Sequence, residues 1–218
     1  MNLTSSLRNI SQQLCKHLNR LPGREPDWDL ETLRYVVLDT ETTGFDYGRD
    51  RILSLGALRL QYETIDVGDC LEIYFQQEFY NEATTEIHGI LSREVRTCLP
   101  EKEGLEKFIQ YLGDDVIVAH HARFDLTMIN NALHRHGFPK LQNPHLDTSA
   151  LYRKTVIDSP VVSKKERYTL DELADKFDIS KKDRHTALGD ALITAIAFLK
   201  ILEALRKKGI TTFRQARR

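Results

Sequence analysis

Apolar residues near the N-terminus recur at helical spacing. Six leucines and isoleucines between residues 3 and 21 follow one another at steps of four, three, four, four and three, which is typical of one apolar helix face. Residues 22–29 contain two prolines and a glycine, and these residues interrupt regular structure. We therefore expect an N-terminal helical extension and linker over residues 1–33, whose apolar stripe packs on the main domain or against a partner.

A pattern of buried β-strands begins after this linker. Residues 35–39 form a run rich in apolar and β-branched residues, which predicts a central strand. Residues 51–60 and 70–76 predict two more strands, with the turn between them near residues 68–69. Three consecutive strands with short connections predict an antiparallel meander.

The rest of the chain alternates short strands with helices. Apolar runs predict strands over residues 116–119 and 145–148. Helical spacing predicts helices over residues 105–112, 124–136, 170–177 and 187–207. A meander followed by alternating strands and helices is typical of an α/β domain with a mixed five-stranded sheet flanked by helices. We expect this domain over residues 34–207, followed by a basic C-terminal tail over residues 208–218.

The net charge of the chain and its distribution limit how a nucleic acid could be bound. The 218 residues include 31 Lys and Arg and 32 Asp and Glu, so the formal net charge is -1. A nucleic acid would therefore be held by local charge rather than by the charge of the whole chain. Residues 200–218 have such a local excess, because seven basic residues and one Glu give +6. Lys181, Lys182 and Arg184 form a second basic group, which we expect to guide a phosphate backbone.

Cysteine usage and hydropathy favour a cytoplasmic protein. Cys15, Cys70 and Cys98 are an odd number without a C-x-x-C pair, so neither a zinc site nor a disulfide framework is predicted. No apolar run approaches the roughly 20 residues that a membrane span requires. The N-terminus also lacks the basic start and apolar run of a signal peptide. We therefore expect a protein in the reducing cytoplasm with no membrane association.

Two carboxylates end the first predicted strand. Asp39 and Glu41 are two residues apart, so their side chains point to the same face of a strand, about 6–7 Å apart, and can converge on a hard cation. A solvated strand end is the alternative, but the apolar strand that leads into the pair favours a site. Thr42 and Thr43 then leave the strand, and Gly44 permits a tight turn close to a ligand.

Two further acids accompany apolar elements. Asp125 follows a buried strand that ends in His120, and its alternative role is to complement the dipole of the next helix. Asp190 lies within an apolar helical stretch, where a carboxylate requires a partner or a metal ion. His185 precedes that helix and, taken alone, is interpreted as a capping or surface histidine.

Together these elements resemble the three motifs of the DEDDh, or DnaQ-like, 3′→5′ exonucleases. The matching segments are Asp39-x-Glu41, His120-x-Ala122-x-Phe124-Asp125 and His185-x-x-x-x-Asp190. The resemblance covers about residues 34–205 and is strongest to the proofreading exonucleases of the DNA polymerase III epsilon type. It implies an RNase H-like fold, which agrees with the predicted mixed sheet. His121 departs from the family pattern, which often has Asn at this position, and its role is left open.

The resemblance also implies a two-metal mechanism. In this family four acids bind two divalent ions, usually Mg²⁺ or Mn²⁺, and here these acids would be Asp39, Glu41, Asp125 and Asp190. His185 would accept a proton from the attacking water as general base, and the products would be nucleoside 5′-monophosphates. Charge supports such a site independently, because four clustered carboxylates repel one another and two divalent ions remove that repulsion.

Other residues are expected near the terminal nucleotide. The substrate-binding residues that the resemblance implies are Thr42, Thr43, Gly44, Ile87, His88, His120 and Phe124. A surface-loop histidine is the alternative for His88, and core packing is the alternative for Phe124. Thr40 alternates away from the two acids of its strand, so we interpret it as structural.

The sequence leaves the nucleic acid open. We expect hydrolysis of single-stranded DNA 3′ ends in proofreading or repair, with a DNA polymerase as a candidate partner. An RNA-trimming exoribonuclease with the same motifs is the alternative within this class, because recognition of the 2′-OH depends on the shape of the site. A polymerase-associated nucleic-acid-binding module with weak catalysis is the alternative outside it, although every motif acid and the histidine are present.

Overall fold

The computed structural model describes residues 27–77, 98–156 and 167–218. The predicted helix over residues 3–21 lies outside these described residues, as do Ile87 and His88. Among the helices of the described ranges, none has the length and apolar character needed to cross a bilayer.

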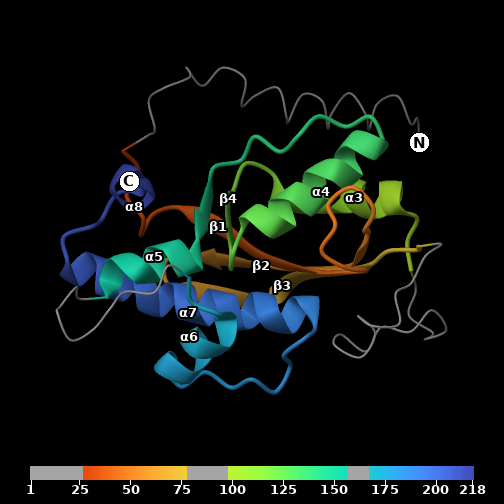
Figure 1. Ribbon diagram of the computed structural model, residues 1–218. Helices are drawn as coiled ribbons and strands as arrows, with labels where there is room; N and C mark the ends of the chain where they lie inside the picture. The colour runs from red at the N-terminus through yellow and green to blue at the C-terminus, as the bar shows by residue number, and fades with distance from the viewer. Residues whose placement is uncertain (1–26, 78–97, 157–166) are drawn as a thin grey trace.

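A five-stranded mixed sheet in the order β3-β2-β1-β4-β5 forms the centre of the domain (Figure 1). β1, β2 and β3 form the antiparallel meander, and β4 and β5 add to β1 in parallel. The strands are β1 (Arg34–Thr42), β2 (Ile52–Gln61), β3 (Thr64–Tyr74), β4 (Val116–Ala119) and β5 (His145–Asp147). The predicted mixed five-stranded sheet is confirmed.

The predicted turn of the β2–β3 hairpin is wrong. The chain turns at Tyr62 and Glu63, which adopt left-handed φ angles of 50° and 58°. Gly68 and Asp69 lie inside β3 instead, next to a shift of register opposite Leu58. A Gly-Asp pair suits a β-bulge as well as a turn, so its composition alone does not distinguish the two.

Helices cover both faces of the sheet (Figure 1). α3 (Glu101–Leu112) and α4 (Arg123–Arg135) pack on one face of the sheet and form an apolar core with it. α7 (Ala187–Lys207) crosses the other face and packs against α5 (Thr148–Thr155) and α6 (Leu170–Phe177). The sheet is therefore the middle of three layers, and its two faces meet different helices.

The alternation of side chains along β1 assigns its residues to these two faces. Leu38 packs in the core with α3 and α4, whereas Val37 packs in the core with α7. By the same alternation, Asp39 and Glu41 lie on the α7 side and Thr40 on the α4 side. β1 thus presents its two acids to one helical layer and a hydroxyl to the other.

Two glycines bring the start of α7 onto this sheet. Gly56 of β2 pairs with Asp39, and a Cβ at Gly56 would lie 2.2 Å from the backbone nitrogen of Leu188. A Cβ at Gly189 would lie 2.0 Å from a backbone carbonyl oxygen of the preceding loop. Any larger residue would push α7 away, so this close approach places Asp190 beside β1.

The last residues of the chain pack on the domain. α8 (Phe213–Arg217) buries Phe213, whose ring centroid lies 5.8 Å from that of Trp28. The backbone N–H of Leu30 donates to the carbonyl oxygen of Thr211 at 2.9 Å. The segment that we expect to be a basic tail therefore contains a short helix that contacts the residues leading into β1. The division into extension, domain and tail stays a prediction.

Candidate active site

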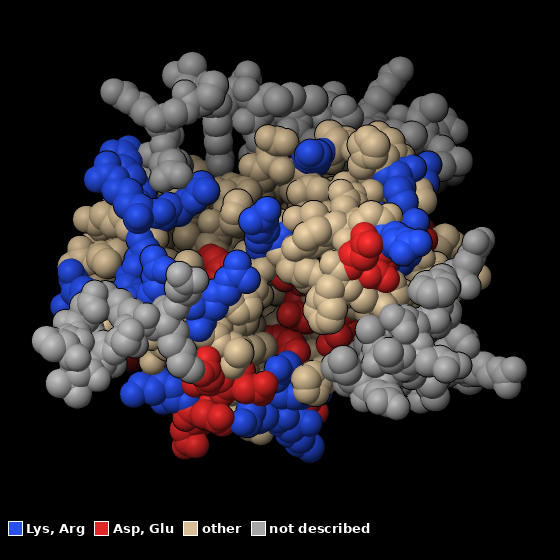
Figure 2. All heavy atoms as spheres, viewed as in Figure 1, with Lys and Arg blue, Asp and Glu red and all other residues tan. Residues whose placement is uncertain are grey.

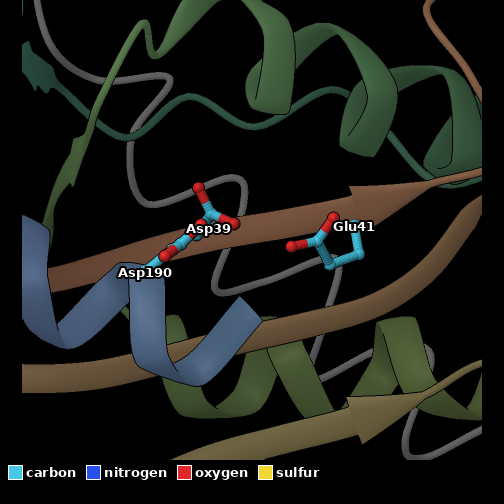
Figure 3. Close-up of side chains that lie close together, drawn as sticks. All are labelled: Asp39, Glu41 and Asp190. Atoms are coloured by element: carbon cyan, nitrogen blue, oxygen red, sulfur yellow. The ribbon is translucent and has the colours of Figure 1, made fainter. Parts of the chain in front are cut away.

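Three of the predicted acids meet at the end of β1 (Figure 3). One carboxylate oxygen from each of Asp39, Glu41 and Asp190 lies within 4.8 Å of the others. β1 supplies the first two, and the first turn of α7 supplies Asp190. Asp39 and Asp190 line a cavity of about 480 Å³, and Figure 2 shows acidic atoms inside a hollow on this face, with Lys and Arg around it.

Asp125 approaches the same cavity from α4. Its Oδ1 accepts hydrogen bonds from the backbone N–H of Thr40 at 3.0 Å and from the Thr40 hydroxyl at 2.7 Å. Asp125 lines the cavity together with Asp39 and Asp190, although it is outside the group of three acids. Thr40 alternates away from the β1 acids as predicted, and the structure adds that it holds the fourth acid.

Arg184 holds one oxygen of Asp190. Its Nη1 contacts Asp190 Oδ2, and its Nε and Nη2 bind the carboxylate of Asp171 on α6 at 2.9 and 3.0 Å. Asp190 Oδ1 is buried and has no hydrogen-bond partner among the described residues. Arg184 is therefore part of the acidic site rather than a free cation for a phosphate backbone, and Lys181 pairs with Asp175 at 2.6 Å. Guidance of a phosphate backbone by Lys181, Lys182 and Arg184 stays a prediction.

Burial and mutual repulsion raise the pKa values of the acids. Burial, and then the charges of the neighbouring acids, raises the pKa of Asp39 well above its usual range. Burial raises the pKa of Glu41 to about 7, and it raises the pKa of Asp125 to about 7 despite the hydrogen bonds from Thr40. Burial also raises the pKa of Asp190, which the Arg184 hydrogen bond partly offsets. Without a cation, this cluster therefore retains protons near neutral pH.

The donor set fits a divalent metal ion. Carboxylate oxygens are the ligands of hard cations such as Mg²⁺, and three of them converge here. Within the described ranges the buried Oδ1 of Asp190 has no partner, and such an atom is normally satisfied by a hydrogen bond or an ion. Asp39, Glu41 and Asp190 are the residues that would hold the ion.

His120 lies on the cavity wall at the end of β4. Its Nδ1 is 2.8 Å from the hydroxyl of buried Thr148, and its buried Nε2 has no hydrogen-bond partner in the part of the chain that the structure describes. Burial, and then the neighbouring His121, lowers the pKa of His120 to about 4, so the imidazole is neutral at pH 7. His121 also lines the cavity and adopts a left-handed φ of 56°. Strained backbone of this kind is frequent at functional sites.

His185 lies on the exposed loop before α7 and has a left-handed φ of 65°. A hydrogen bond from its backbone, together with the charge of its imidazole, helps to lower the pKa of Asp190. The side chain is thus near the acids, while the cavity wall, as far as the described residues form it, consists of other residues. Its role as general base stays a prediction.

An aromatic cluster borders the cavity. Phe45 and Tyr47 follow β1, and each ring centroid lies 5.7 Å from that of Phe124. Phe45 is 78% exposed and Tyr47 is 40% exposed, whereas Phe124 also packs against the core of α3 and α4. The sequence indicated only Phe124. Two aromatic residues in an otherwise polar turn, directly after Gly44, were the signal that would have identified the other two.

The predicted residues Thr42, Thr43 and Gly44 shape this turn. The Thr42 hydroxyl donates to the carbonyl oxygen of Gly44 at 2.8 Å, and the Thr43 hydroxyl donates to Asp50 at 2.7 Å. A Cβ at Gly44 would lie 2.5 Å from the Asp50 carboxylate, so the close approach at Gly44 is to Asp50. These contacts position Phe45, and direct contact of the three residues with substrate stays a prediction.

A helix-flanked mixed sheet with acids clustered at the end of its central strand defines a nuclease architecture of the RNase H-like type. Residues 36–198 match the RNase_T family model, described as an exonuclease, and the chain therefore belongs to this exonuclease family. The crystal structure of E. coli Exonuclease I in complex with a dT13 oligonucleotide has the same fold. It superimposes with a TM-score of 0.68 at 18% identity, over 82% of this chain and 43% of that one.

Curated relatives agree with this class. The chain is 32% identical over 171 residues to the DNA polymerase III subunit epsilon of Aquifex aeolicus, covering 78% of this chain and 81% of the relative. It is 35% identical over 188 residues to a DNA polymerase III subunit epsilon-like protein of Rhodobacter capsulatus, covering 84% of this chain but 26% of the relative. The chain spans about an eighth of several PolC-type relatives. The resemblance to DEDDh 3′→5′ exonucleases is confirmed.

Proposed function

We propose that this chain hydrolyses single-stranded DNA from the 3′ end and releases nucleoside 5′-monophosphates. The observation that carries the proposal is the convergence of the Asp39, Glu41 and Asp190 carboxylates, at a cavity that Asp39, Asp125 and Asp190 line. The printed names of two comparisons support DNA as the substrate, because one relative is a DNA polymerase III epsilon subunit and one structural neighbour contains a dT13 oligonucleotide.

Two divalent ions would neutralise the acids in this proposal. Asp39, Glu41 and Asp190 would hold one ion, and Asp39 with Asp125 would hold the other. When bound, a metal pair of this kind supplies an activated water and stabilises charge on the attacking and leaving oxygens. The chain contributes rigidity, because Thr40 fixes Asp125 and Arg184 fixes Asp190. Carboxylates that are already oriented need little reorganisation during the reaction.

The two motif histidines have different tasks in this proposal. His185 accepts the proton of the attacking water, because an imidazole is well suited to that exchange near neutral pH. His120 stays neutral, and its unpartnered Nε2 on the cavity wall forms a hydrogen bond with the terminal nucleotide. The hydrogen bond between His120 and Thr148 fixes the orientation of that ring.

The direct test uses 5′-labelled single-stranded DNA and RNA of the same sequence, with Mg²⁺, Mn²⁺ or EDTA. We expect a metal-dependent ladder that shortens from the 3′ end, and faster shortening of DNA than of RNA. Faster shortening of RNA would replace DNA by RNA as the substrate. Absence of both ladders, with folded protein and bound metal, would contradict the exonuclease proposal.

The aromatic cluster predicts binding of the terminal base. Stacking of a base on an aromatic side chain contributes about 1–3 kcal/mol, so we expect Phe45→Ala to raise KM for an oligonucleotide at least about fivefold. The turnover number should change much less, because Phe45 is not one of the acids. Steady-state kinetics would measure both quantities. Tyr62→Ala is the matched control, because Tyr62 is also exposed and lies on the β2–β3 turn; equal KM values for the two variants would contradict base stacking.

The ion pair between Arg184 and Asp171 predicts a positioning role for Asp171, which is half-exposed on α6. Because a hydrogen bond to a charged group contributes about 1.5–3 kcal/mol, we expect Asp171→Asn to lower kcat about tenfold and to weaken Mn²⁺ binding measured by calorimetry. Asp175→Asn removes the same charge from the same helix but only the Lys181 pair. Equal effects of the two variants would show that charge, rather than the Arg184 contact, is responsible.

Partner and location are proposed from less direct observations. The epsilon name of the relatives supports a DNA polymerase as partner, which co-purification from the source cells would test. Cys70 and Cys98 are free and exposed, and exposed free cysteines are typical of a reducing cytoplasm.

A further inference from the structure

The C-terminal ends of α5, α7 and α8 form a basic corner, which we define by Arg153, Lys154, Lys208, Arg214 and Arg217. The first two residues end α5, Lys208 caps α7, and the last two belong to α8. Neither α5 nor α8 contains an acidic residue. These helix ends lie at the left of Figure 1, and Figure 2 shows Lys and Arg gathered there on the same face as the acidic hollow.

Backbone carbonyl groups hold the two lysines of the basic corner. Lys154 Nζ donates to the carbonyl oxygen of Gln215 at 3.4 Å, and Lys208 Nζ donates to the carbonyl oxygen of Lys154 at 3.0 Å. Burial, and then the charge of Arg153, lowers the pKa of Lys154. Carbonyl partners orient an ammonium group without neutralising its charge. These two lysines are therefore held in place while they keep a positive charge that attracts anions.

α5 connects the basic corner with the cavity of the acids. Its first residue, Thr148, contacts His120 on the cavity wall, and its last turn contains Arg153 and Lys154. α5 has eight residues, so the two ends are about 12 Å apart. At roughly 3.4 Å per nucleotide of a stacked strand, this length corresponds to three or four nucleotides.

We propose that the basic corner binds backbone phosphates of the substrate strand, three or more nucleotides to the 5′ side of the terminal nucleotide. This inference rests on the proposed function, because it assigns the corner to the same strand whose 3′ end enters the cavity. A nucleic acid fits better than an acidic protein, since α5 fixes the distance between these cations and the exonuclease cavity. The corner also supplies the local positive charge that a chain with net charge -1 requires.

Charge reversal of two exposed residues tests the proposal. The double variant Arg153→Glu, Lys208→Glu lowers the net charge of the corner by four. The control variant Lys102→Glu, Lys107→Glu makes the same change in net charge at exposed positions of α3. We would measure the Kd of dT20 by fluorescence anisotropy in EDTA, at several salt concentrations. Turnover of dT3 and dT20 would be measured with Mn²⁺, and circular dichroism would verify folding.

We expect the basic-corner variant to bind dT20 at least tenfold more weakly than wild type. Its salt dependence should be flatter by about 1.4 in the slope of log K against log salt, because each phosphate contact of a single strand contributes about 0.7. Turnover of dT3, which is too short to reach the corner, should stay within about twofold, and the α3 variant should match wild type in every measurement.

Equal dT20 binding and equal salt slopes in the basic-corner variant and wild type would overturn the inference. A similar loss in the α3 variant would also overturn it, because bulk charge would then explain binding. Failure of the proposed function gives a different result, since wild type would then leave both dT3 and dT20 intact. The two hypotheses can therefore fail separately.

Discussion

Asp39→Asn will lower turnover of single-stranded DNA at least about a thousandfold, which is within the range for loss of an essential catalytic group. Asp39 lies among the other acids of the site, since the charges of Asp125, Asp190 and Glu41 all raise its pKa. Asparagine keeps its shape but removes the charge that would hold a divalent ion. Single-turnover degradation of a 5′-labelled oligonucleotide in Mn²⁺ measures the loss.

The same substitution should stabilise the protein in EDTA. At alkaline pH the four clustered carboxylates lose the protons that they retain near neutral pH and repel one another, so removal of one charge should there raise the Tm of Asp39→Asn above that of wild type. Mn²⁺ should then raise the Tm of wild type more than that of the variant. Asp175→Asn, a loss of charge outside the cluster, should change neither quantity. A variant that keeps full turnover would contradict the metal site, and a variant that is less stable in EDTA would contradict the repulsion.

His185→Ala will lower the rate by about 10²–10⁴-fold, the usual effect of losing a general base. Mn²⁺ binding should persist, because His185 is outside the group of three acids that would hold the ion. Single-turnover rates at saturating Mn²⁺ and calorimetric Mn²⁺ titration measure these two effects separately. The variant and wild type should have similar Tm values, since His185 is exposed.

His134→Ala is the matched control for this prediction. His134 is also an exposed histidine, but it lies in the last turn of α4. Its substitution should leave the rate unchanged. A loss below tenfold in His185→Ala would show that another group activates water, and a parallel loss of Mn²⁺ binding would show that the loop positions the acids instead.

Short-range patterns were sufficient to predict most of the fold and the motif acids. Period-two alternation along residues 35–41 placed Asp39 and Glu41 on one face of β1 and Thr40 on the other, as the structure shows. Helical spacing identified α6 and α7 with the bounds that the structure has. These patterns depend on the covalent geometry of neighbouring residues, which is the same in any fold.

Contacts between distant side chains could not be predicted in this way. Arg184 lies in a basic run just before His185, which indicated a phosphate guide, but its guanidinium binds Asp171 and Asp190. The exposure of Phe45 beside Phe124 depends on how the turn after β1 lies over α4. The hairpin turn at Tyr62 and Glu63 also differs from the prediction, because strand register decides where a bulge replaces a turn.

By itself, the sequence determined the order of strands and helices, the acids that we propose for metal-dependent hydrolysis, and the common strand face of Asp39 and Glu41. Only the tertiary structure decided that Asp190 meets Asp39, that Arg184 takes one of its oxygens, and that the ends of three helices form a basic corner. The physical reason is that the two depend on contacts at different separations along the sequence. Periodicity is set by the geometry of a few consecutive residues, whereas convergence depends on close approaches such as that of α7 to Gly56, which form only when the whole sheet and its helices pack together.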